Sequence, residues 1–108
     1  MQLSVTGRHI DVTPAMRQYA EDKAGKFTRY YDRIESIEVI LEQESMRPRV
    51  ELVVRTDHKQ TLVAHVDASD FYEAIDLVSD KMGRQLTKHK EKLRNRKHPG
   101  RTENFPES

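Results

Sequence analysis

The sequence predicts a single α+β domain in which a four-stranded sheet carries two helices on one face. Four segments alternate apolar and polar residues, as strands with one buried face do. Two longer segments repeat apolar residues every three or four positions, as helices with one buried stripe do. Elements that are each apolar on one side bury those sides in two layers, and 108 residues suffice for one such core.

The first two elements are a short strand and a helix. Residues 2–6 alternate, with Leu3 and Val5 on one face, and Gly7 is expected to end the strand. Thr13 and Pro14 are a strong helix start, because Thr caps free amides and Pro is tolerated at the first helical position. We expect this helix to reach about residue 30, with Gly25 as a weak point costing ~1 kcal/mol relative to Ala.

Three strands are predicted next, over residues 36–42, 49–55 and 60–67. The connections between them are short enough for antiparallel hairpins. The first strand of the chain, which a helix joins to the second, is expected to pair parallel with it through a right-handed crossover. The element order is therefore β-α-β-β-β-α.

The last helix is predicted over residues 70–96. Asp70 and Glu73 form a capping-box pattern at its start. Its apolar stripe consists of Phe71, Ile75, Val78, Met82, Leu86 and Leu93, with His89 filling the gap. Such a helix would be ~40 Å long against ~20 Å for six-residue strands, so its turns from Lys88 onward should overhang the sheet. The domain then covers residues 1–96, and residues 97–108 form a flexible tail.

Charge is distributed unevenly along the chain. Residues 1–80 hold 10 basic and 15 acidic side chains, whereas residues 81–101 hold nine basic side chains and one acid, Glu91. An ordinary solvated face would mix both signs, so this composition favours a surface that binds a polyanion, above all nucleic acid. At 100° per residue one strip of the last helix gathers Lys81, Arg84, Lys88 and Lys92, with Gln85 at its edge. Lys23, Lys26 and Arg29 form a second basic edge on the first helix.

Catalysis is not expected. The chain has no cysteine, no glycine-rich phosphate loop and no histidine spacing typical of a metal site. Asp76 and Asp80 are interpreted as solvated charges on an open helical face. Tyr30, Tyr31, Tyr72 and His89 are interpreted as boundary packing in preference to RNA contacts. No secretory signal or apolar span of about 20 residues is present, so the cytoplasm is the expected location.

Four segments resemble one protein family. They are MQLSVTG at the N-terminus, YYDRI at residues 30–34, DFYEAID at residues 70–76 and DKMGRQLTKHKEKL at residues 80–93. Together they are similar to the short ribosome hibernation-promoting factors, relatives of the ribosome-associated inhibitor A that were once called sigma-54 modulation proteins. The resemblance covers residues 1–94 and implies the same β-α-β-β-β-α fold.

The resemblance also implies a function and a site. Members of this family bind the small ribosomal subunit in stationary phase or stress, in the channel for messenger RNA and the A-site and P-site transfer RNAs. This chain would then silence translation by occlusion, as a monomer off the ribosome and without a cofactor. The RNA-binding positions that the resemblance implies are Lys23, Lys26, Lys81, Arg84, Gln85, Lys88, Lys90 and Lys92.

Two questions stay open from the sequence. Short hibernation factors are associated with ribosome pairing, assisted by a small ribosome modulation factor, whereas the inhibitor A relative has a tail that opposes pairing. Residues 101–108 fit either a passive appendage or such a tail. The alternative functions are a double-stranded RNA-binding module, whose core order is α-β-β-β-α, and a protein-interaction module that uses the basic helix. The acidic start of the last helix argues against the first alternative, and the burial of its apolar stripe against the second.

Overall fold

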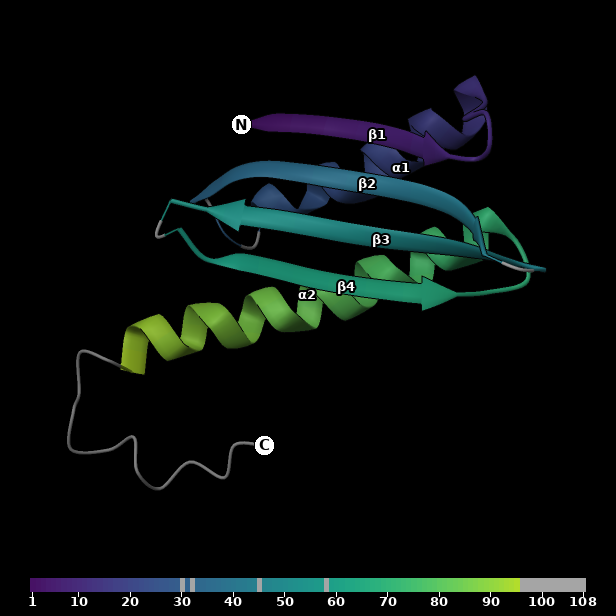
Figure 1. The fold of residues 1–108 in the computed structure, drawn as a ribbon. Coiled ribbons are helices and arrows are strands. Elements are labelled where there is room, and N and C mark those ends of the chain that lie inside the picture. The colour runs from purple at the N-terminus through teal and green to yellow at the C-terminus, as the bar shows by residue number, and fades with distance from the viewer. Residues whose placement is uncertain (30, 32, 45, 58, 96–108) are drawn as a thin grey trace.

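The four strands and two helices follow one another in the predicted order, and a short 3-10 helix that was not predicted follows the first helix. The computed structural model describes residues 1–29, 31, 33–44, 46–57 and 59–95. The elements are β1 (Gln2–Arg8), α1 (Pro14–Gly25), the short 3-10 helix η1 (Lys26–Arg29), β2 (Ile34–Glu44), β3 (Arg47–Thr56), β4 (Thr61–Asp67) and α2 (Phe71–Asn95) (Figure 1). The predicted tail, Tyr30 and the side chain of Leu93 lie outside the described part of the chain.

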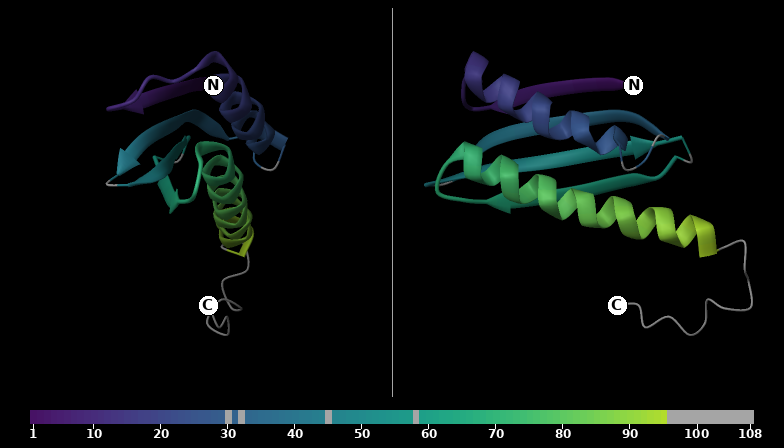
Figure 2. Two further views of the ribbon diagram at one scale, coloured as in Figure 1. Left: turned by 90° about the vertical axis from the view of Figure 1, so that its right-hand side faces the viewer. Right: turned by 180° about the vertical axis from the view of Figure 1, so that it is seen from behind.

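The sheet has the strand order β1-β2-β3-β4. β1 pairs parallel with β2, and the other two pairings are antiparallel, which confirms the predicted strand pairing and hairpins. The crossover through α1 is left-handed and not right-handed as predicted, because β2 lies to the left of β1 when the helices face the viewer and β1 points upward (Figure 2). Both helices cover the same face of the sheet, and they run side by side in the same direction (Figure 2). The two-layer α+β prediction is therefore confirmed.

The core lies between the sheet and the helices. Alternate residues of the central strands point into it, and α2 adds the apolar stripe that its sequence period predicts. The largest fully buried apolar side chains are Ile37, Val39, Leu41, Val50, Leu52, Val54, Ile75, Val78, Met82 and Leu86. The position of α2 on the sheet is thus set by its own apolar face.

Both helices begin with the predicted caps. The amide of Met16 donates to the Thr13 hydroxyl at 3.1 Å, and the amide of Glu73 donates to the Asp70 carboxylate at 2.8 Å. The return arm of the capping box differs from expectation, because Glu73 accepts from the amide and hydroxyl of Ser69. The first helix also ends earlier than predicted: α1 stops at Gly25, and the chain continues in the tighter turn of η1.

The strands are longer than predicted, so the difference in length between α2 and the strands does not explain the predicted overhang of α2. β2 and β3 have 11 and 10 residues, so they span ~33 to ~36 Å, close to the ~37 Å of the 25-residue α2. The C-terminal end of α2 nevertheless projects from the body, because the helix crosses the sheet obliquely and passes beyond β4 (Figures 1 and 2). Its last turns lie both beyond the β4 edge and past the ends of the strands (Figures 1 and 2).

β1 continues through Gly7 to Arg8, although Gly7 was expected to end it. A Cβ at this glycine would lie 2.6 Å from the Ile10 carbonyl oxygen and 2.9 Å from a methyl group of Val12. The glycine therefore allows the chain after β1 to turn closely back over the strand.

The outer face of the sheet carries charges of both signs. At one end of the sheet, the strand register places Arg8, Glu42, Arg49 and Asp67 in one row across all four strands. Arg8 pairs with Glu42 and Arg49 pairs with Asp67, both at 3.5 Å. A face of alternating charge offers no uniform attraction to a polyanion, so the candidate site lies on the helical layer.

Candidate nucleic-acid interface

The basic strip of α2 lies on the side of the helix that faces the β4 edge. We use the name edge strip for Lys81, Arg84, Gln85, Lys88 and Lys92. The four cations are exposed and Gln85 is half-buried. They are held on one helix whose neighbouring apolar face is in the core, so the charges are presented on a rigid support.

Two members of the edge strip also bind the edge of the sheet. The Gln85 side-chain amide donates to the Val63 carbonyl at 3.1 Å, and the Lys81 ammonium lies 3.4 Å from the His65 carbonyl oxygen. A helical side chain also binds the opposite edge of the sheet: the Arg17 guanidinium on α1 donates to the Val5 carbonyl of β1 at 3.0 Å. Long side chains from the helices therefore cover carbonyl groups on both edge strands, which are sites where another strand could otherwise pair.

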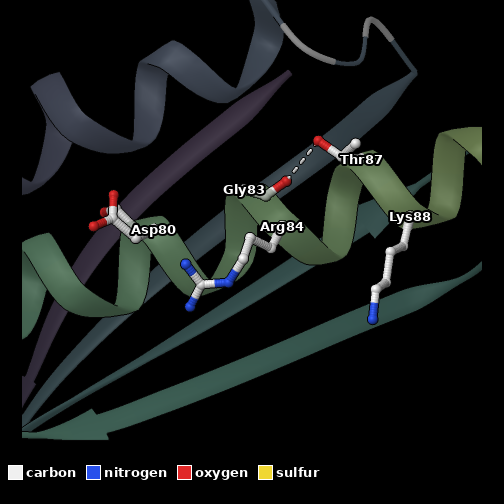
Figure 3. A pocket seen from close by; sticks show the side chains of 6 residues that line it. Asp80, Gly83, Arg84, Thr87 and Lys88 are labelled. Atoms are coloured by element: carbon white, nitrogen blue, oxygen red, sulfur yellow. Dashed lines mark hydrogen bonds between the residues drawn. The ribbon is translucent and has the colours of Figure 1, made fainter. Parts of the chain in front are cut away.

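Arg84 and Lys88 leave α2 on the same side, whereas Asp80 and Thr87 leave it on the other (Figure 3). A shallow open hollow between them is lined by Ser79, Asp80, Gly83, Arg84, Thr87 and Lys88. Within it, the Thr87 hydroxyl donates to the Gly83 carbonyl at 3.0 Å. The helix is continuous through Gly83, so this residue does not interrupt the support of the strip.

The three remaining predicted site residues lie elsewhere. Lys23 is on the last turn of α1, Lys26 is exposed at the start of η1, and Lys90 leaves α2 about 160° around the axis from Lys88, toward α1. We call Lys23, Lys26 and Lys90 the α1-side group. The C-terminal ends of α1 and α2 lie at the same end of the molecule (Figure 2). The eight predicted residues therefore divide between two sides of α2.

Lys23 belongs to a polar network between the helices. Its ammonium lies 3.0 Å from the Asp76 carboxylate and 5.7 Å from the centre of the Tyr19 ring. The Tyr19 hydroxyl donates to the same Asp76 oxygen at 2.7 Å. The interpretation of Asp76 as an ordinary solvated charge was therefore wrong, because α1 brings two donors to it.

The network changes the protonation equilibria of its members. The hydrogen bond from Tyr19, followed by that from Lys23, lowers the pKa of Asp76, although partial burial opposes this. The hydrogen bond to Asp76 is also the main reason that the pKa of Tyr19 and the pKa of Lys23 are raised. The charged forms of Lys23 and Asp76 are thus each favoured by the other.

Three of the aromatic residues that the sequence assigns to packing, Tyr31, Tyr72 and His89, are packed against other rings. Tyr31 is buried and meets His89 edge to face, with ring centres 5.5 Å apart. Tyr72 is partly exposed, but its ring meets that of Tyr19 edge to face at 5.1 Å. Neither pair presents the open parallel platform on which RNA bases stack.

The described residues support neither a metal site nor a membrane-spanning helix. No group of three or more acidic, histidine or cysteine side chains there is arranged to hold a metal ion. Within the same residues, neither helix combines the length and the apolar character needed to cross a lipid bilayer.

Comparison with known proteins identifies relatives that match most of the chain. The family model described as sigma 54 modulation protein / S30EA ribosomal protein matches residues 3–94. The chain is 41% identical over 92 residues to the ribosome hibernation promoting factor of Azotobacter vinelandii, covering 85% of each protein. It is 36% identical over 94 residues to the Escherichia coli K12 protein of that name, covering 87% of this chain and 98% of that protein.

Two solved structures have folds similar to that of this chain. A ribosomal subunit interface protein from Coxiella burnetii matches with a TM-score of 0.77 and 29% identity, over 83% of this chain and 98% of that one. The N-terminal domain of Protein Y from Thermus thermophilus matches with a TM-score of 0.72 and 27% identity, over 82% and 99% respectively.

Proposed function

This chain belongs to the sigma 54 modulation protein / S30EA ribosomal protein family, and we propose that it silences ribosomes by binding small-subunit rRNA through the edge strip and the α1-side group. Its relatives are named ribosome hibernation promoting factors, so the chain is a ribosome-associated protein of that family rather than an enzyme. The finer proposal is that it occupies the channel for messenger RNA and the A-site and P-site transfer RNAs, in the cytoplasm, during stationary phase or stress.

The observation that carries the proposal is the edge strip. Four exposed cations lie along one side of a helix that the core holds rigid, so the backbone that carries them needs no further ordering when they bind. Phosphate contacts of this kind position a protein on RNA by shape and charge, without reading base sequence. Occlusion of the channel requires no chemistry beyond such binding.

The proposal predicts a strong dependence of binding on salt. If about six Lys or Arg side chains neutralise phosphates, log affinity should fall against log salt with a slope of roughly −4 to −5. A slope near zero would rule out binding that is dominated by phosphate contacts.

Sedimentation tests the proposal directly. Bacterial ribosomes are centrifuged through sucrose gradients with and without the purified protein, at low and moderate salt, and each fraction is probed for the protein. We expect it to migrate with the small subunit and with whole ribosomes. Protein that stays at the top of the gradient at both salt concentrations would overturn the proposal.

The same gradients test ribosome pairing. A peak of paired ribosomes, with or without an added ribosome modulation factor, would assign a pairing activity to the chain. Deleting residues 101–108 tests the tail: more pairing after the deletion would identify a blocking tail, and unchanged pairing a passive one.

The two alternative functions are less well supported. A protein-interaction module would need the apolar face of α2 to be free, but Ile75, Val78 and Met82 are fully buried in the core. A double-stranded RNA-binding module would need a basic start to α2, where the sequence has Asp70 and Glu73.

A further inference from the structure

One predicted phosphate-binding residue, Lys23, is already paired with an acid of the same chain. Its ammonium lies 3.0 Å from Asp76, and both side chains remain about one third to two fifths exposed. Resting on the proposed function, we propose that Asp76 is an internal competitor of RNA phosphate for Lys23, and that it thereby limits the affinity of the α1-side group.

The carboxylate of Asp76 is held in place independently of Lys23. Tyr19 donates its hydroxyl to the oxygen that also faces the ammonium, at 2.7 Å, and the Tyr19 ring is itself fixed edge to face against Tyr72. When a phosphate draws Lys23 away, Asp76 therefore stays where it is. The phosphate must compete for the ammonium and must also approach a fixed negative charge.

The edge strip has no comparable acid. Among the described residues, no ion pair involves Lys81, Arg84 or Lys88, and the partner of Lys81 is a neutral carbonyl group. The charges of the edge strip are thus open to phosphate from the start, while that of Lys23 is compensated. The two groups of cations differ in availability even though they carry the same kind of charge.

Two acidic residues near Lys23 make it possible to distinguish the effect of a direct contact from the effect of negative charge nearby. Asp76 makes the hydrogen bond, whereas Asp80, one turn further along α2, acts on Lys23 only through its charge. Asp76→Asn and Asp80→Asn remove the same charge from the same helix. Asp80→Asn is therefore the matched control.

The test measures binding of the full chain to purified bacterial 30S ribosomal subunits across a salt series. The variants are Asp76→Asn, Asp80→Asn, Lys23→Gln and the Asp76→Asn/Lys23→Gln double variant. For Asp76→Asn we expect affinity to rise roughly 2- to 5-fold at low salt, the range expected for a partly exposed ion pair. The salt slope should steepen by about 0.7 to 0.9, the value for one more phosphate contact. The gain should exceed that of Asp80→Asn and should be lost when Lys23 is replaced.

Two results would overturn the inference while leaving the proposed function intact. One is an equal gain from Asp76→Asn and Asp80→Asn, and the other is a gain that persists without Lys23. Absence of 30S binding by the unaltered chain would instead overturn the proposed function. Asn keeps the size of Asp and still accepts from Tyr19, and circular dichroism verifies the fold of each variant.

A second measurement needs no ribosome. The lysines are reductively methylated with ¹³C-formaldehyde, and the titration of Lys23 is followed by NMR in the free protein. The pKa of Lys23 should fall on Asp76→Asn and stay nearly unchanged on Asp80→Asn. Equal values for the unaltered chain and Asp76→Asn would show that the contact is absent in solution, and the inference would fail.

Discussion

The side-chain amide of Gln85 donates to the main-chain carbonyl of Val63 at 3.1 Å, and so ties the middle of α2 to the outer edge of the sheet. Because Lys81 reaches the His65 carbonyl one turn earlier, one stretch of the edge strip both offers cations and closes the β4 edge. The candidate interface is therefore built into the part of the fold that prevents edge-to-edge pairing.

Replacing Gln85 with Leu should test this structural role. The variant loses a partly exposed hydrogen bond, so we expect the free energy of unfolding to fall by about 0.5 to 1.5 kcal/mol. Urea denaturation monitored by circular dichroism provides the measurement. The control is Thr61→Val, a substitution of an exposed residue on β4, the strand that Gln85 contacts. If both variants lose the same free energy of unfolding, the effect is not specific to the Gln85 contact.

Charge reversal at Lys88 and Lys92 should weaken binding to ribosomes while preserving the fold, because both side chains are exposed. Loss of two phosphate contacts should make the salt slope shallower by about 1.4 to 1.8. The matched control is Arg55→Glu/Lys59→Glu, which changes the net charge equally on exposed residues of β3 and the turn after it. If both double variants weaken 30S binding alike, net charge rather than the edge strip governs the affinity.

The stability of the chain should depend on pH through Asp76. The folded state lowers the pKa of this carboxyl, so its contribution is present above the unfolded value, about 3.9, and is lost as the pH falls through the folded value. Asp76→Asn should therefore be less stable than the unaltered chain at pH 6, and the difference should shrink below pH 4. Thermal unfolding between pH 2.5 and 7 checks this, and a difference that stays constant over that range would contradict it.

Two glycines should respond oppositely to alanine. At Gly7 the added Cβ would meet the Ile10 carbonyl at 2.6 Å, so we expect Gly7→Ala to cost about 1 to 3 kcal/mol of unfolding free energy. At Gly25 nothing lies within 4 Å of the new atom, so Gly25→Ala should stabilise the chain by up to about 1 kcal/mol. The denaturant midpoints of the two variants, compared with that of the unaltered chain, show whether each substitution stabilises or destabilises the fold.

Much of the fold could be predicted because its signals are local. The alternation of β2 to β4, the stripe of α2 and the caps at Thr13 and Asp70 each depend on residues close together in the chain. The boundaries of the elements were predicted less accurately, because the length of a strand depends on the strand with which it pairs. β2 and β3 extend each other through residues whose own composition does not require a strand, up to the pair of Glu44 with Arg47.

The site was predictable in part for the same reason. A helix has a known angular period, so the grouping of Lys81, Arg84, Lys88 and Lys92 on one side of α2 follows from the sequence. The contact of Lys23 with Asp76 spans 53 positions and depends on how α1 lies against α2, which no local pattern encodes.

The sequence by itself determined which residues form helices and strands, which faces they bury and where positive charge accumulates, since periodicity and charge are properties of neighbouring residues. Only the tertiary structure decided what each polar side chain does with its charge. The crossing of α2 past β4 brings Lys81 and Gln85 to the sheet edge, and the packing of α1 on α2 brings Lys23 to Asp76. Hydrogen bonds and ion pairs act over a few ångströms, so they depend on distances that the packing of distant segments sets.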